Sequence, residues 1–195
     1  MSDEHEIEDD GAEAPRIDPE TAARRAAAMR YVRQFGDPVL KSRAMTVSRF
    51  DDDLREQIRG MGEIMNDAFG IGLAATQLGK LNRVLVYRVE QDSPAIALVN
   101  PELEWSGDEL ETAEEGCLSL RGVLVDVERP VHVRVRAQDE QGDEVVVEAS
   151  GLEARVIQHE MDHLDGVLIL DRTSRDQRKQ AMRALREQTA ADEAA

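Results

Sequence analysis

The sequence predicts an α+β fold in which mixed or antiparallel sheets pack around a central helix, with a further helix at the C-terminus. Three observations support this prediction. Apolar residues recur at helical spacing over residues 51–69 and again over 151–164. Between these segments lie several strand-like runs, two of which alternate apolar and charged residues. Helices and strands in separate blocks are typical of α+β rather than alternating βαβ order.

The first strong helix is expected over residues 51–69, where three Asp side chains suit the N-terminal turn and Gly70 is the expected end. Its apolar face consists of Leu54, Ile58, Met61, Met65 and Phe69. Upstream, Asp18 or Thr21 is a candidate cap for a short Ala/Arg-rich helix. Residues 35–38, Phe-Gly-Asp-Pro, predict a turn into the folded body.

Strands are expected at residues 84–89, 96–99, 123–127, 131–137 and 144–149. The last two strands predict a hairpin that turns at Gly142-Asp143. Helical spacing returns over 151–164. A short extended stretch at 166–170 and a final amphipathic helix at 173–188, capped by Thr173 or Ser174, complete the prediction.

Length and composition restrict the class of protein. The 195 residues suit one domain, and with 41% hydrophobic but 3% aromatic residues the core must be mainly aliphatic. A net charge of −17 argues against binding nucleic acid through a broadly basic surface. We expect no membrane span and no signal peptide, hence a cytoplasmic protein. The single Cys excludes an intrachain disulfide.

The charge is unevenly distributed. Residues 1–20 hold nine acidic and one basic side chain, for −8; residues 21–49 hold one acidic and seven basic, for +6; residues 50–195 hold 31 acidic and 16 basic, for −15. The first segment is low in apolar residues and highly charged, a composition typical of disorder.

The most informative motif is Gln-His-Glu-Met-Asp-His at residues 158–163. His159 and His163 are about one helical turn apart, so both rings project from one face and can share a metal ion. Glu160, beside that face, is placed to act as a general base on a metal-bound water. The alternative interpretation is a helix that carries two His residues without a metal.

A catalytic site of this type needs a third protein ligand. Downstream, Asp165, Asp171 and Asp176 are candidates. Cys117 is another, in the Glu-Glu-Gly-Cys-Leu-Ser segment that we place in a Gly-containing turn between strands. A thiolate with two imidazoles suits a divalent transition metal, whereas the alternative for Cys117 is a small buried side chain.

Residues 70–77, Gly-Ile-Gly-Leu-Ala-Ala-Thr-Gln, form a third unusual segment. Small residues allow a backbone to approach a ligand closely, and the Gln77 amide could polarise a substrate oxygen. The alternative is a loop that is tightly packed for structural reasons.

Together, these segments resemble the peptide deformylase family, which carries G-φ-G-φ-A-A-x-Q, E-G-C-L-S and Q-H-E-x-D-H in this order. Residues 70–77, 115–119 and 158–163 match them in turn, and residues 35–40 and 163–172 are also similar. The resemblance covers roughly residues 30–175. It implies the family's α+β fold and hydrolytic removal of formyl from N-formylmethionyl chains, with release of formate.

The resemblance also implies roles for individual residues. The metal ligands would be Cys117, His159 and His163. Glu160 would be the general acid/base, and the oxyanion donors would be the Gln77 side chain and the Leu118 backbone N–H. The substrate-binding residues would be Ile71, Gly72, Leu73 and Gly116. The metal would be Fe²⁺ in the cell, with Zn²⁺, Ni²⁺ or Co²⁺ able to occupy the site.

We therefore expect an acidic, disordered extension with a short helix at 1–29, a deformylase-like catalytic domain at 30–175, and a C-terminal helix and tail at 176–195. The expected partners are N-formylmethionyl peptides and the ribosome near the nascent-chain exit, with no DNA and no membrane. Segment 21–49 is a candidate contact for the acidic segment or for ribosomal RNA. We expect a monomer.

Two arginines leave alternatives open. Arg121 stands where the family commonly has Pro, and it either serves the substrate or is an exposed loop residue. Arg155, one turn before His159, either meets a substrate carbonyl or carboxylate or snorkels from the pocket wall. Glu115 is expected to accept hydrogen bonds near Cys117, and Asp162 to orient Gln158 or nearby arginines. Rival functions are a zinc peptidase with the same motif and a catalytically silent binding module.

Overall fold

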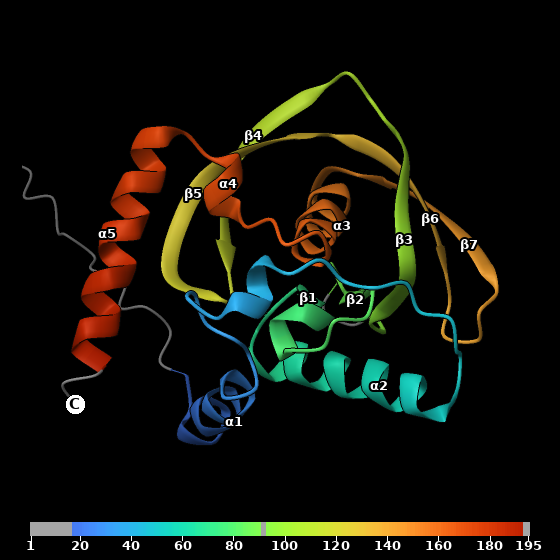
Figure 1. The fold of residues 1–195 in the computed structure, drawn as a ribbon, viewed down its shortest axis with the longest axis horizontal. Helices are drawn as coiled ribbons and strands as arrows, with labels where there is room; N and C mark the ends of the chain where they lie inside the picture. The colour runs from blue at the N-terminus through green and yellow to red at the C-terminus, as the bar shows by residue number, and fades with distance from the viewer. Residues whose placement is uncertain (1–16, 91–92, 193–195) are drawn as a thin grey trace, which may run out of the picture.

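The computed structural model describes residues 17–90 and 93–192, so most of the predicted acidic extension lies outside the described residues. Its strands form two sheets around one long helix (Figure 1). The larger sheet has the order β1-β2-β3-β6-β7, while β4 pairs with β5. All of these pairs are antiparallel. The strands are β1 (Gly72–Ala74), β2 (Val84–Tyr87), β3 (Ile96–Ser106), β4 (Leu110–Cys117), β5 (Leu120–Pro130), β6 (His132–Gln138) and β7 (Glu144–Ser150).

The helices confirm the predicted α+β class. They are α1 (Pro19–Met29), α2 (Asp52–Asp67), α3 (Gly151–Leu164), α4 (Ile169–Arg172) and α5 (Arg175–Asp192), with short 3-10 turns η1 (Pro38–Lys41) and η2 (Ala75–Leu78). Asp18, Asp51 and Ser174 each accept a hydrogen bond from the backbone N–H three residues further on, at the starts of α1, α2 and α5. These bonds satisfy N–H groups that have no partner within the helix.

Three apolar clusters hold the layers together. One lies between α3 and the larger sheet, and includes Ile157 and Val135. The second joins β5 to α4 and α5, and the third joins α2 to β1, β2 and β3. In Figure 1, α3 consequently lies between the β4–β5 pair and the larger sheet, α2 runs beneath β1 and β2, and α5 flanks β5. The helix predicted to be central is therefore enclosed by both sheets.

The strand prediction was incomplete around β4, which was not expected. Four of the last five residues of β4 before Cys117 are exposed or half-buried, so the apolar alternation that marks a strand is absent from the sequence. Cys117, predicted in a turn, is instead the last residue of β4, and Leu118-Ser119 form the turn to β5. Residues 169–170, predicted to be extended, begin the short helix α4.

The end of α2 also differs from the prediction. Phe69, rather than Gly70, adopts the left-handed conformation after the helix, with φ of 62°. A Cβ at Gly70 would lie 3.0 Å from the Leu118 side chain and 3.2 Å from the Gly72 carbonyl oxygen. Gly70 is therefore needed because its neighbours pack closely against it. The residue with the strained, left-handed backbone is Phe69.

Helices in residues 17–90 and 93–192 do not combine the length and apolar composition that crossing a membrane requires.

Candidate metal centre and its pocket

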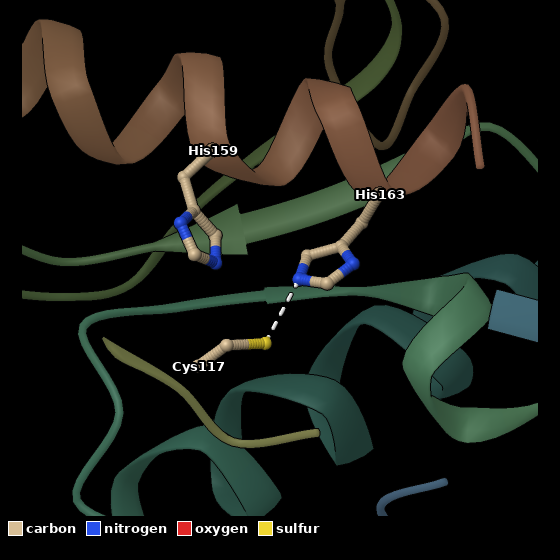
Figure 2. A group of neighbouring side chains, drawn as sticks. All are labelled: Cys117, His159 and His163. Atoms are coloured by element: carbon tan, nitrogen blue, oxygen red, sulfur yellow. Dashed lines mark hydrogen bonds between the residues drawn. The ribbon is translucent and has the colours of Figure 1, made fainter. Parts of the chain in front are cut away.

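The three predicted metal ligands converge. Cys117 comes from the end of β4, and both His residues come from α3, as Figure 2 shows. The candidate ligand atoms all lie within 4.8 Å of one another, and Cys117 Sγ is 3.2 Å from His163 Nε2. The side chain of His159 is 12% exposed and the His163 residue 2% exposed. One thiol and two imidazoles at this spacing fit a divalent transition metal.

Local structure explains this convergence. Residues four apart on α3 lie on one face, which brings both rings toward the sulfur. On the opposite side, the β4–β5 pairing shifts register between Gly116 and Cys117, directly before the tight turn. The Ser119 backbone N–H donates to Cys117 Sγ at 3.4 Å and Gln77 Nε2 donates at 3.6 Å. The turn and the Gln77 side chain thus hold the sulfur toward the imidazoles.

His159 is oriented from behind by Glu115. The Glu115 Oε2 atom lies 2.9 Å from His159 Nδ1, which leaves Nε2 for the cluster. Burial by itself would raise the pKa of Glu115, but hydrogen bonds from His159 and Arg129 outweigh it and lower the pKa to about 2. Glu115 is therefore a fixed anion across the physiological pH range.

A buried ion network surrounds Glu115. Arg129 donates to both Glu115 oxygens, at 2.7 and 3.0 Å, and to Asp162 Oδ2 at 2.9 Å. Arg172, at the end of α4, also donates to Asp162. The expectation that Asp162 orients nearby arginines is confirmed, whereas Gln158 bonds backbone carbonyls instead. The network ties β4, β5, α3 and α4 together behind the metal ligands.

Arg155 belongs to the same network. Its guanidinium donates to Glu115 Oε1 at 2.8 Å, to the Val127 carbonyl at 2.9 Å and to the Glu111 carbonyl at 2.8 Å. The group is thus bonded to protein atoms within the wall, which differs from both alternatives raised for it. Arg129 was missed by sequence reasoning. Its position in the sequence could have revealed it. Arg129 lies two residues beyond Val127 and so falls on the same inward face of β5.

Glu160 has a different environment. It is 4% exposed, and its Oε2 atom has no hydrogen-bond partner within the described part of the chain. Burial raises its pKa to about 7. A Cβ at Gly72 would lie 2.4 Å from Glu160 Oε1, so only glycine leaves room for this carboxylate. The site therefore holds a carboxyl group able to take up and release a proton near neutrality.

The segment at 70–77 forms β1 and η2 beside this carboxylate. The Gln77 Oε1 atom accepts a bond from the Ala74 N–H at 2.9 Å, which directs Nε2 toward Ser119 Oγ at 3.2 Å. Preceding residues brace both sides: the Arg33 N–H donates to the Gln77 carbonyl at 2.7 Å, and Gln34 Nε2 donates to the Leu118 carbonyl at 3.3 Å.

A cavity of about 500 Å³ opens beside the cluster. Among its lining residues are eight predicted for the site or its metal, namely Ile71, Gly72, Gln77, Gly116, Cys117, Leu118, His159 and Glu160, and Arg155 also lines it. Sequence reasoning did not identify the apolar wall formed by Leu120, Val123, Leu124, Leu152 and Val156. The Leu73 side chain does not line the cavity, because it is fully buried in the core shared with α2.

Comparisons with known proteins agree with this geometry. The family described as polypeptide deformylase matches residues 29–179. A peptide deformylase of Acidothermus cellulolyticus is 48% identical over 160 residues, covering 82% of this chain and 87% of the relative.

Solved structures match over a similar span. A peptide deformylase from Synechococcus elongatus, in complex with actinonin, has a TM-score of 0.76 and 44% identity, covering 78% of this chain and 85% of that one. One from Thermotoga maritima has a TM-score of 0.71 and 45% identity, covering 73% and 96%. Since sequence and structure agree over the span that carries the metal cluster and its pocket, this chain belongs to the polypeptide deformylase family, metal-dependent hydrolases that remove the N-formyl group from nascent polypeptides.

Proposed function

We propose that Cys117, His159 and His163 hold one divalent metal ion, and that the adjoining cavity takes the N-formylmethionyl end of a nascent polypeptide. The observation that carries this proposal is the convergence of the three ligand atoms within 4.8 Å beside a cavity that also contains Glu160. The chain is thus a hydrolase that acts in N-terminal methionine processing during protein biosynthesis.

The donor set supports a transition metal rather than Mg²⁺ or Ca²⁺, which prefer oxygen ligands. We propose Fe²⁺ as the ion in the cell, with Zn²⁺, Ni²⁺ and Co²⁺ as ions that the same donors accept. When bound, the ion supplies Lewis acidity and lowers the pKa of a coordinated water. Glu115 lies within hydrogen-bond distance of His159 Nδ1 and so orients the ring with Nε2 toward the ion.

The remaining chemistry falls to residues of the chain. Glu160 accepts a proton from the attacking water, whose oxygen bonds to the formyl carbon. Gln77 Nε2 and the Leu118 N–H donate hydrogen bonds to the carbonyl oxygen as its negative charge develops. Glu160 then passes the proton to the departing amine nitrogen as the C–N bond breaks. The products are formate and a polypeptide with a free N-terminal methionine.

The apolar wall supports methionine as the first residue. Leu120, Val123 and Val156 provide apolar surface beside the cluster, which suits a long unbranched side chain. Ile71, just before β1, and Gly72, its first residue, line the cavity, where they are placed to contact the substrate backbone. Gly116 also lines the cavity. The Leu73 side chain is buried, so only its backbone is available to contact the substrate.

Further expectations follow from the substrate. Nascent formylated chains are made by ribosomes, so we propose that the protein works in the cytoplasm as a monomer, near the ribosomal exit. We also propose that residues 30–175 are the catalytic domain, with 1–29 and 176–195 as an extension and a C-terminal segment.

Anaerobic purification with Fe²⁺, followed by formate release from formyl-Met-Ala-Ser, tests the function. We expect metal-dependent formate release and no cleavage of unformylated Met-Ala-Ser. Peptide-bond cleavage would indicate the rival zinc peptidase, and binding without turnover would indicate a silent binding module. The Cys117→Ala variant should lose stoichiometric metal in elemental analysis. Full retention would refute the ligand role of Cys117.

A further inference from the structure

A second groove adjoins the catalytic cavity. It measures about 630 Å³ and lies between α1 and the turn after β4. It shares Cys117, Leu118 and Gly122 with the catalytic cavity, so the two hollows adjoin each other along this turn. When the formyl group of a peptide is bound at the metal cluster, the rest of the peptide must extend out of the cavity. This groove offers a path for it, because Cys117 of the cluster is one of its lining residues.

The groove is positively charged, although the chain as a whole carries −17. Arg25, Arg30 and Arg121 are among its lining residues, and no acidic residue of the described part of the chain is. All three side chains belong to exposed residues. Over residues 17–90 and 93–192, none of the three makes an ion pair, in contrast to Arg129 and Arg155 in the wall of the site. Three uncompensated cations in one groove favour an anionic ligand.

Arg25 lines the groove and also contacts a residue that lines the catalytic cavity. Its guanidinium lies 5.6 Å from the centre of the Phe69 ring, and Phe69 lines the catalytic cavity. Its Nε donates to the Ala68 carbonyl at 3.5 Å. These contacts place one cation beside a lining residue of the catalytic cavity, and Arg121, just past the turn that carries Leu118, also lines the groove. A ligand that extends from the cavity into the groove therefore meets cations from α1 and from the start of β5.

We propose that this groove binds acidic side chains located downstream of the formylmethionine, so that the enzyme favours nascent chains with Asp or Glu among their first residues. Arginine suits this role because its planar guanidinium pairs with a carboxylate through two parallel hydrogen bonds. The proposal rests on the proposed function, because it assumes that the formyl group binds at the cluster.

The chain contains a competing anion. Residues 1–16 hold seven acidic side chains and end beside Ile17, which lines the groove. The lining residues that the groove shares with the catalytic cavity favour the substrate as the occupant. The two occupants predict opposite effects of salt: screening weakens attraction of an acidic substrate, whereas it would release an acidic segment and expose the site to every substrate.

The test compares formyl-Met-Ala-Asp-Glu-amide with formyl-Met-Ala-Asn-Gln-amide, which differ in charge and hardly in shape. We expect the full-length Fe²⁺ enzyme to show a higher kcat/KM for the acidic peptide, mainly through a lower KM, and we expect added salt to reduce this ratio. Exposed ion pairs are weak, so Arg121→Ala or Arg25→Ala should each lower the ratio about two- to fivefold. The triple variant with Arg30→Ala should lower it further.

Arg24→Ala is the matched control. Arg24 lies on the same helix and carries the same charge, but it bonds Thr21 and does not line the groove. It should leave the ratio at the wild-type value. Equal kcat/KM values for the two peptides in wild type, or an equal loss in Arg24→Ala and Arg121→Ala, would overturn the proposal. Faster hydrolysis of the uncharged Asn-Gln peptide with added salt would identify residues 1–16 as the occupant of the groove. That result would also overturn the proposal. Failure to hydrolyse either peptide would instead overturn the proposed function.

Discussion

Two carboxylates that line the catalytic cavity near the His159 ligand have contrasting surroundings. Glu115, in the wall behind the cluster, accepts hydrogen bonds from Arg129, Arg155 and His159. Glu160, on the cavity side, leaves one oxygen without a hydrogen-bond partner among the described residues. The pKa of Glu115 is lowered to about 2 by its cationic neighbours, and that of Glu160 is raised to about 7 by burial.

The difference shows how one site can use the same functional group in two ways. A carboxylate with several cationic partners keeps its charge and its position, and can therefore hold a ligand ring in place. A buried carboxylate without such partners changes its protonation state easily near neutrality, as a proton carrier must. Exchanging these surroundings would be expected to destroy both roles, and substitutions can test each side separately.

The largest effect is expected from Glu160→Gln. The amide preserves the shape of the side chain but cannot accept and return a proton, so we expect kcat to fall about a thousandfold, within the range of general acid–base catalysis. Formate release from formyl-Met-Ala-Ser measures this loss. Elemental analysis should show that the variant retains its metal. Equal rates for wild type and Glu160→Gln would refute the proton-transfer role.

Sequence reasoning identified the residues at the centre of this comparison because their chemistry is recorded in short motifs. The spacing of His159 and His163 predicts a shared helical face, and the structure has that helix over the predicted residues. The resemblance then provided Cys117, which the spacing of residues alone had left as one of several candidates. Residues 151–164 were predicted well because the period of α3 is uninterrupted.

The wall behind the ligands was only partly predictable. Its partners come from β4, β5 and α4, which meet only after folding, and no local pattern records a contact between Arg129 and Asp162. The predicted strand at 123–127 ended before Arg129, whereas β5 continues to Pro130. Leu73 is a different case: the resemblance implied a substrate-binding residue, but strand alternation turns its side chain into the core, which leaves only its backbone for that role.

A second substitution tests the cavity side without changing a charged group. In Gly72→Ala, the added Cβ would meet Glu160 Oε1 at 2.4 Å, so the carboxylate must move. A displacement of about 1 Å costs on the order of a hundredfold in rate, and we expect kcat to fall by about that factor. Steady-state kinetics should show this loss with metal content intact.

Gly60→Ala is the matched control for the added methyl group. Gly60 lies on α2 and its Cβ would meet nothing within 4 Å. We expect unchanged kinetics and a free energy of unfolding higher by about 1 kcal/mol, because alanine is the better helix former. Wild-type kcat in Gly72→Ala would contradict the view that this glycine exists to make room for Glu160.

The third substitution, Glu115→Gln, acts on the wall. Glutamine keeps an acceptor for His159 but removes the charge that compensates Arg129 and Arg155, so metal affinity should fall about 10- to 100-fold. The free energy of unfolding should also fall by about 3 kcal/mol, because two buried cations lose one of their carboxylate partners. Competition with a chelator measures the affinity, and denaturant titration the stability. Glu128→Gln is the matched control, because it also removes one negative charge but at an exposed position of β5. It should change neither the metal affinity nor the free energy of unfolding.

The pH dependence of stability distinguishes the charge of Glu115 from its shape. Because its pKa falls from 4.5 to about 2 on folding, the carboxylate stabilises the native state above about pH 4.5, and this contribution is lost as the pH falls toward 2. Glu115→Gln should therefore be less stable than wild type at neutral pH, and the gap should close in acid. A gap that is constant from pH 7 to pH 3 would mean that the wall needs the shape of residue 115 rather than its charge, and the contrast with Glu160 would then not be electrostatic.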